Sequence, residues 1–289
     1  MKTLVTGATG KLGSKVMNFL MEAVPAEQLA VSVRDPARAE DLKNRGVDVR
    51  QGDFEKPETL STAFKNVDKI LIISTTGDNE TRIREHQNAV QAAAEVGVDF
   101  IAYTSLADAE NSSLFLAPVH RKTEKAIKAT GIPYSFLRNN WYLRNELPSI
   151  KAAISGQPWV TAAKDGKVGW ALQKDYAEAA AKVLSESGHE NTVYELSAQP
   201  LTQAELVSAA EEVIGQEIPI KRVNDEEYKQ IMKKSGMPES SLPMLAAIQR
   251  GIREGALNVK SNDFEKLLGR PATPIKQALE ELLQEADLI

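Results

Sequence analysis

The chain has 289 residues, of which 42% are hydrophobic and 26% are charged, and its formal net charge is −5. This mixture is typical of a globular protein long enough for one large core or two domains. The acidic balance argues against nucleic-acid binding, which favours a basic stripe. The chain has no cysteine, which excludes disulfides and thiol nucleophiles, and its three histidines are scattered rather than spaced as metal ligands.

The first residues already have the pattern of a β-strand, and the longest apolar runs are only as long as strands. We therefore expect no signal peptide before the fold and no membrane span. These features predict a soluble cytoplasmic protein, and a homodimer is possible.

A glycine-rich turn follows the first predicted strand. In the stretch from Thr3 to Gly13, three glycines recur at three-residue spacing, and a helical pattern begins at Lys11. Gly7 lets the chain turn sharply, Gly10 leaves room for a pyrophosphate, and Gly13 lets the helix pack close to the strand. The N–H groups that begin the helix then face the phosphates. The alternative is a glycine-rich turn without a ligand. The predicted dinucleotide-binding residues here are Gly7, Ala8, Thr9, Gly10, Lys11, Leu12 and Gly13.

Strand and helix patterns alternate from Thr3 to about Leu137. Such alternation predicts an α/β fold of the Rossmann type, a doubly wound parallel sheet with helices on both faces and ligands at the carboxyl ends of the strands. After the first strand and helix, the expected strands are Leu29 to Arg34, Val47 to Asp53, Lys69 to Ser74, Phe100 to Thr104 and Pro133 to Leu137, and the expected helices are Pro57 to Phe64, Glu80 to Val96 and His120 to Thr130.

The regular alternation ends after Leu137. The segment from Asn139 to Gly169 has many prolines and glycines and is expected to be loop-rich. We expect the helix Asp175 to Ser185 and the strand Val193 to Ser197 to return to the sheet. Residues 1–138, with 175–197, should form an NAD(P)-binding domain, and residues 139–174 and 198–289 a smaller, mostly helical substrate-binding lobe. Its expected helices are Thr202 to Ile214, Asp225 to Lys234, Ser241 to Glu254 and Pro274 to Glu285.

The end of the second strand carries two arginines. A guanidinium at the position of Arg34 can accept the 2′-phosphate of NADPH, and Arg38 can add a second charge. An acidic residue there would instead bind the ribose hydroxyls of NADH, and Asp35 could still do so. The other reading is a solvated charged turn. The pattern favours NADPH over NADH.

Two more strand ends provide candidate cofactor contacts. Asp53 can accept from the adenine amino group and Phe54 can cover the ring, although a simple turn aspartate is an equal alternative. Ser74, Thr75 and Thr76 follow the fourth strand, where the nicotinamide ribose should lie; the alternative is a run that caps the next helix.

The glycine spacing resembles the extended and atypical short-chain dehydrogenases/reductases. That family keeps a catalytic serine at the end of the fifth strand, which makes Ser105 a candidate. Its usual Tyr-x-x-x-Lys pair is missing here, because Leu116 and His120 occupy the matching positions. His120 could relay a proton, since the ordinary histidine pKa lies near neutrality. It could equally cap or pack the start of the helix.

Further stretches carry a resemblance over nearly the whole chain. The most specific is Arg138-Asn139-Asn140-Trp141-Tyr142; the others are Phe100 to Leu106, Thr123 to Lys125, Gly131 to Tyr134, Asp165 to Lys167, Asp175 to Ala177, Val193 to Leu196 and Leu267 to Pro271. Together they resemble the NmrA-like atypical short-chain dehydrogenases/reductases, and among them the bacterial NAD(P)H:quinone oxidoreductases of the second type.

The resemblance implies NADPH as cofactor, a quinone as acceptor, and no flavin or metal. The family's cofactor residues fall on Gly7 to Leu12, Arg34, Ser74 to Thr76 and the loop that begins at Arg138. Arg138, Asn139 and Asn140 are therefore candidate cofactor ligands.

Quinone reduction agrees with the missing tyrosine. A quinone accepts hydride at an electron-poor centre, so positioning can supply most of the effect and little general-acid help is needed. Phe115, Trp141 and Tyr142 are candidate flat surfaces for a planar acceptor, with ordinary packing of the lobe as the alternative. Two other functions stay open, a dinucleotide-binding redox sensor without turnover and a reductase of cationic dyes.

Overall fold

A seven-stranded sheet forms the centre of the computed structural model, which describes all residues from Met1 to Ile289. The strand order is β3-β2-β1-β4-β5-β6-β9, and every pair is parallel. The order reverses between β1 and β4, where sheets of this type bind ligands. The strands are β1 (Thr3–Thr6), β2 (Leu29–Val33), β3 (Asp48–Gln51), β4 (Lys69–Ile72), β5 (Phe100–Leu106), β6 (Tyr134–Asn139) and β9 (Thr192–Leu196).

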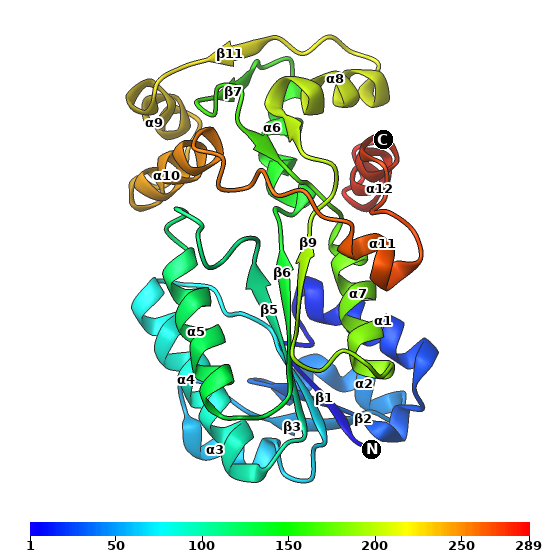
Figure 1. Cartoon of the computed structure of the whole chain (residues 1–289). Coiled ribbons are helices and arrows are strands. Elements are labelled where there is room, and N and C mark those ends of the chain that lie inside the picture. Colours follow the sequence, from blue (N-terminus) through cyan, green and yellow to red (C-terminus); the bar gives the residue numbers. More distant parts are fainter.

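Helices cover both faces of this sheet (Figure 1). One face packs against α1 (Lys11–Ala23), α2 (Glu40–Asn44), α7 (Gln173–Ser185) and α11 (Asp263–Leu268). The other packs against α3 (Pro57–Ala63), α4 (Asn79–Val96) and α5 (Ala117–Ala129). The alternation along β5 explains the two layers, because Ala102 enters the first core and Tyr103 the second.

A third core builds a lobe beyond the carboxyl ends of β5, β6 and β9 (Figure 1). β7 (Trp159–Thr161) pairs with β11 (Ile220–Arg222), and β8 (Lys167–Val168) with β10 (Leu201–Thr202). The lobe helices are α6 (Leu147–Ile154), α8 (Gln203–Ile214), α9 (Asp225–Lys234), α10 (Leu242–Arg253) and α12 (Ile275–Glu285). Short 3-10 turns are η1 (Ala26–Gln28), η2 (Pro36–Ala39), η3 (Leu143–Glu146) and η4 (Glu239–Ser241). None of the helices combines the length and apolar character needed to cross a bilayer.

The predicted Rossmann-type sheet is confirmed; in it, β9 pairs with β6, and α7 packs on the face that α1 covers. The segment from Asn139 to Gly169 differs from its predicted loop-rich character, because α6, β7 and β8 lie within it. These elements are short, and Pro148 stands in the first turn of α6, where proline is tolerated. The prediction also places the start of α5 at His120, whereas the helix begins at Ala117 with a proline in its first turn.

The turn between β1 and α1 depends on glycine. Gly7 has a φ of +63°, which L side chains rarely adopt. At Gly13, a Cβ atom would lie 2.3 Å from the carbonyl oxygen of Gly7 and 2.8 Å from the Cα of Ala8. These distances are far below van der Waals contact, so α1 can approach β1 this closely only with glycine at that position.

We expect Gly13→Ala to lower the free energy of unfolding by about 1–3 kcal/mol, because the added methyl group forces the helix away from the turn. Gly10→Ala is the matched control: its φ is −84°, and its Cβ would lie 3.2 Å from the Gly7 oxygen. Urea denaturation of both variants measures the difference. Equal stabilities for Gly13→Ala and the parent protein would contradict the close-packing account.

Candidate functional site

The N-terminus of α1 lies beyond the carboxyl end of β1, where the strand order of the sheet reverses. Gly10 is its N-cap residue, no side chain caps it, and its first turn holds no acidic residue. The free N–H groups and the helix dipole therefore favour an anion at this point. This arrangement suits the pyrophosphate of a dinucleotide against the residues from Gly7 to Gly13.

The two arginines after β2 are exposed and form no ion pair or side-chain hydrogen bond. Arg34 and Arg38 therefore keep their guanidinium groups free for a phosphate. Asp35 is used differently, because its Oδ1 accepts the N–H of Ala37 at 3.1 Å and caps η2. The arrangement favours a 2′-phosphate over a ribose hydroxyl at this position.

The carboxyl ends of β3 and β4 hold the next predicted contacts. Asp53 Oδ1 accepts the N–H of Glu55 at 3.1 Å, so the alternative role of a turn aspartate is present, and Phe54 is partly packed on the core of the α3–α5 face. Ser74 and Thr75 are half-buried and held by their backbone N–H groups. Ser74 N donates to Thr104 Oγ1 at 2.9 Å, and Thr75 N donates to His86 Nε2 at 3.0 Å. Thr76 is exposed.

His120 lies in a buried polar cluster beneath this end of β4. Its Nδ1 is 2.9 Å from the hydroxyl of Tyr103, and its Nε2 is 3.4 Å from the guanidinium of Arg82. Burial, followed by the charge of Arg82 and by His86, lowers the pKa of His120 well below its usual value. The imidazole is therefore neutral, which favours the packing alternative for His120. Its role as a proton relay stays a prediction.

Ser105 and Arg138 belong to a buried ion-pair network on the α5 face of the sheet. Arg138 donates to Glu124 Oε1 and Oε2 at 2.9 and 2.8 Å and to Glu195 Oε1 at 3.0 Å. Ser105 Oγ donates to Glu124 Oε1 at 2.6 Å. The backbone N–H of Asp108 donates to Glu195. The network joins β5, β6, β9 and α5, and its contacts give Arg138 and Ser105 a structural role.

The two asparagines after Arg138 lie differently. Asn139 is 5% exposed, its Nδ2 donates to the Tyr142 hydroxyl at 3.1 Å, and its Oδ1 has no partner. A buried carbonyl oxygen without a partner is costly, and a hydroxyl or amide of a ligand would satisfy it. The Nδ2 of Asn140 donates to Ser197 Oγ and to the carbonyl of Leu257, and its Oδ1 accepts the N–H of Trp141.

The candidate acceptor residues lie where the lobe meets the sheet. Trp141 and Tyr142 are half-buried, and the Tyr142 ring packs 5.0 Å from the ring of Tyr176. The backbone oxygen of Phe115 accepts from Asn79 Nδ2 at 2.6 Å. The neighbouring Leu114 packs so closely on α10 that a Cβ on Gly251 would lie 2.5 Å from it. The loop after β5 and α10 are therefore in direct contact.

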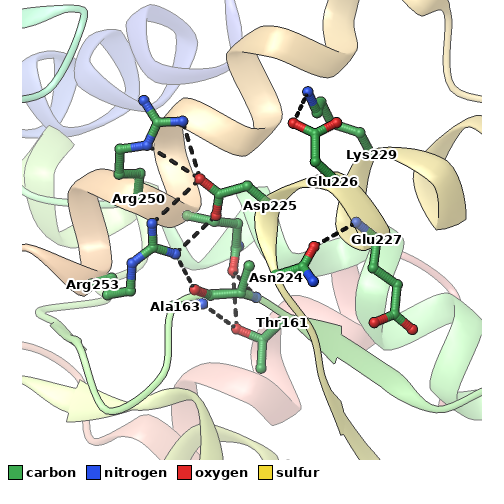
Figure 2. Close-up of polar contacts among 11 residues, drawn as sticks. Thr161, Ala163, Asn224, Asp225, Glu226, Glu227, Lys229, Arg250 and Arg253 are labelled. Atoms are coloured by element: carbon green, nitrogen blue, oxygen red, sulfur yellow. Dashed lines mark hydrogen bonds and ion pairs between the residues drawn. The ribbon is translucent and has the colours of Figure 1, made fainter.

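Charged contacts fix α9 and α10 to the rest of the lobe. Figure 2 shows Arg250 and Arg253 both directed at Asp225, the first residue of α9. Arg253 also donates to the carbonyl of Ala162, beside β7. An open hollow of about 890 Å³ lies over this cluster. It is separate from the strand ends, and its acidic and basic side chains largely neutralise one another.

Sequence reasoning missed Glu146 at the end of η3. This half-buried carboxylate accepts from Trp170 Nε1 at 3.0 Å and forms no ion pair. Burial raises its pKa to about 7, although the indoles of Trp170 and Trp141 partly oppose this. A single glutamate within a stretch that the sequence predicts to be loop-rich carries no signal of such surroundings, because its partner Trp170 is distant in sequence. No group of three or more His, Cys, Asp or Glu side chains is arranged to hold a metal ion.

We expect Arg138→Met to lower the free energy of unfolding by about 3–5 kcal/mol, because it leaves two largely buried carboxylates without their cation. Arg45→Met, which removes an exposed pair with Asp41, is the control and should cost at most about 1 kcal/mol. Chemical denaturation and NADPH titration test both variants. If Arg138→Met kept the stability of the parent protein but lost NADPH affinity, Arg138 would be a cofactor ligand and not a structural residue.

Glu146 should make stability depend on pH. Its pKa is raised above the usual 4.5, so the unfolded chain ionises first, and the folded state loses stability from about pH 4.5 to about pH 7. Glu146→Gln removes this penalty. Its melting temperature relative to the parent should therefore rise across that interval, whereas Glu280→Gln, at an exposed site on α12, should show no such trend. A flat difference between parent and Glu146→Gln would refute this account of the carboxyl.

Comparisons with known proteins agree with this geometry. The model of the NmrA-like family matches residues 1–268. Quinone oxidoreductase 2 of Escherichia coli (strain K12) is 41% identical over 283 residues, which are 96% of this chain and 97% of that protein. Its structure with NADPH superposes with a TM-score of 0.93 at 39% identity, covering 97% of this chain and 99% of the other. Citrobacter sp. triphenylmethane reductase complexed with NADP(H) gives a TM-score of 0.92 at 41% identity, covering 98% and 100%. The chain belongs to the NmrA-like family.

Proposed function

We propose that this chain is an NADPH-dependent reductase that transfers hydride to a quinone or a similar planar, electron-poor acceptor. The observation that carries the proposal is the pairing of an uncapped α1 N-terminus with the free guanidinium groups of Arg34 and Arg38 at one edge of the sheet. The E. coli relative is a quinone oxidoreductase and the Citrobacter relative is a triphenylmethane reductase, which supports the proposal.

The residues present fit NADPH. The turn from Gly7 to Gly13 would hold the pyrophosphate and Arg34 the 2′-phosphate. The unpartnered Oδ1 of Asn139 offers a buried acceptor at the end of β6. Bound NADPH would supply the hydride. Residues 1–138 and 175–197 would then form the cofactor domain, and residues 139–174 and 198–289 the acceptor lobe.

The acceptor would lie against the aromatic side chains at the junction, Trp141, Tyr142 and Phe115. Their role is to place the acceptor ring and exclude water. No tyrosine acid is required, because the hydroquinone oxygens can take protons from water. The buried Tyr103 is unsuited to that task, since burial raises the pKa of its hydroxyl.

Arg34→Ala tests the function and its cofactor together. The loss of a charge-assisted contact should weaken NADPH by about 1.5–3 kcal/mol and leave NADH nearly unchanged. Steady-state reduction of a simple quinone with each cofactor measures this in kcat/KM. An equal loss for both cofactors, or no loss, would remove Arg34 from the 2′-phosphate site.

A further inference from the structure

Arg82 is a buried arginine that no carboxylate pairs with. It lies on α4, is 5% exposed, and its Nε has no hydrogen-bond partner. Its guanidinium donates to Ser74 Oγ at 2.8 Å and faces His120 Nε2 at 3.4 Å. Glu85 forms no hydrogen bond with Arg82, because its carboxylate accepts from the Thr75 hydroxyl. Its negative charge affects the pKa of Arg82 only by long-range electrostatic attraction. Arginine keeps its charge when buried, so an uncompensated cation stands behind the end of β4.

The surrounding imidazoles do not neutralise this charge. His86 Nε2 accepts the N–H of Thr75, so its proton is on Nδ1, which lies 2.9 Å from Thr123 Oγ1. The Thr123 hydroxyl in turn donates a hydrogen bond to the carbonyl of Val119 at 2.9 Å. His120 presents Nε2 to the guanidinium, so its Nδ1–H points to Tyr103. Both rings are neutral, and Arg82 is the one cation within this cluster.

Ser74 links the charge of Arg82 to the carboxyl ends of the strands. Its hydroxyl oxygen accepts from Arg82 at 2.8 Å, and it also contacts the hydroxyl of Tyr103. Ser74 is half-buried and lies at the end of β4, beside the turn that follows β1. A hydroxyl that accepts from a cation becomes a stronger donor through its own proton.

We propose that Arg82, acting through Ser74, builds an oxyanion-type site for the acceptor oxygen that gains negative charge. The inference rests on the proposed function and specifies a carbonyl acceptor. Bound NADPH would supply the hydride and be oxidised to NADP⁺; in net terms the hydride adds to one quinone oxygen while an electron pair shifts through the ring onto the other oxygen. The resulting hydroquinone monoanion accepts the Ser74 hydrogen bond and then takes a proton from water. Arg82 is thus a positioning residue that supplies the positive potential which the family's usual tyrosine–lysine pair would otherwise provide.

Binding of p-nitrophenol tests the proposal without turnover. Its ionised form carries negative charge on a phenolic oxygen and absorbs differently from the neutral form, so a titration reports which form is bound. The parent protein should prefer the phenolate and lower the pKa of the bound ligand. Arg82→Met and Ser74→Ala should lose this preference, and Arg82→Lys should restore part of it. Arg84→Met, an exposed arginine on the same helix, is the matched control and should keep it.

A second test compares the rates at which the variants reduce a neutral quinone and a cationic dye. Arg82→Met should slow quinone reduction on the order of 10²-fold at saturating NADPH, with little change in NADPH affinity. It should not slow reduction of a cationic triarylmethane dye, because hydride transfer there removes a charge instead of creating an anion. Equal losses for both acceptors, or an unchanged phenolate preference, would overturn the proposal.

Stability needs separate control because Arg82 is buried. Thermal melting of each variant identifies unfolding, and Ser74→Ala, which leaves the arginine in place, keeps the test valid if Arg82→Met does not fold. The two hypotheses fail differently. A parent protein that binds NADPH yet reduces no quinone overturns the proposed function, whereas an active parent with fully active Arg82 and Ser74 variants overturns only the oxyanion-type site.

Discussion

The close approach of α1 to β1 governs the geometry of the candidate site. A hydrogen at Gly13, in place of a side chain, lets the helix begin directly over the carbonyl of Gly7. The first N–H groups of α1 have no side-chain cap, because Gly10 is the N-cap residue, and they lie where the strand order reverses. Arg34 directly follows the neighbouring strand, β2, and its charge is unpaired. The close-packed turn and the free guanidinium thus follow adjacent parallel strands, β1 and β2.

Two buried arginines organise the other strand ends in opposite ways. Arg138 is matched by Glu124 and Glu195, so its charge is used to join β5, β6, β9 and α5. Arg82 has no such match, and the tautomers of the neighbouring histidines leave its charge in place. The charge of Arg138 is neutralised by its carboxylates and serves to hold the strands together, whereas the charge of Arg82 is available to polarise neighbouring groups. The second arrangement therefore points to chemistry at Ser74.

The sheet could be predicted from sequence because its signals are local. The β-branched runs, the glycine spacing and the capping box of Thr202 with Glu205 each lie within a few residues, and all correspond to observed elements. Roles that depend on distant partners could not be predicted. Arg138 meets Glu195 across 57 positions, a pairing that only the fold reveals. His120 likewise has no local signal that it would face Arg82.

A single-turnover experiment tests the central claim most directly. The protein is mixed with one equivalent of NADPH and one of a simple quinone in the absence of air, and the absorbance of the reduced nicotinamide is followed. The account predicts rapid one-to-one oxidation of NADPH by the parent protein, and none above background by a folded Gly10→Val variant, whose side chain would stand where the pyrophosphate meets the backbone. Tight NADPH binding by the parent protein without oxidation by any quinone would contradict the account and favour a dinucleotide sensor.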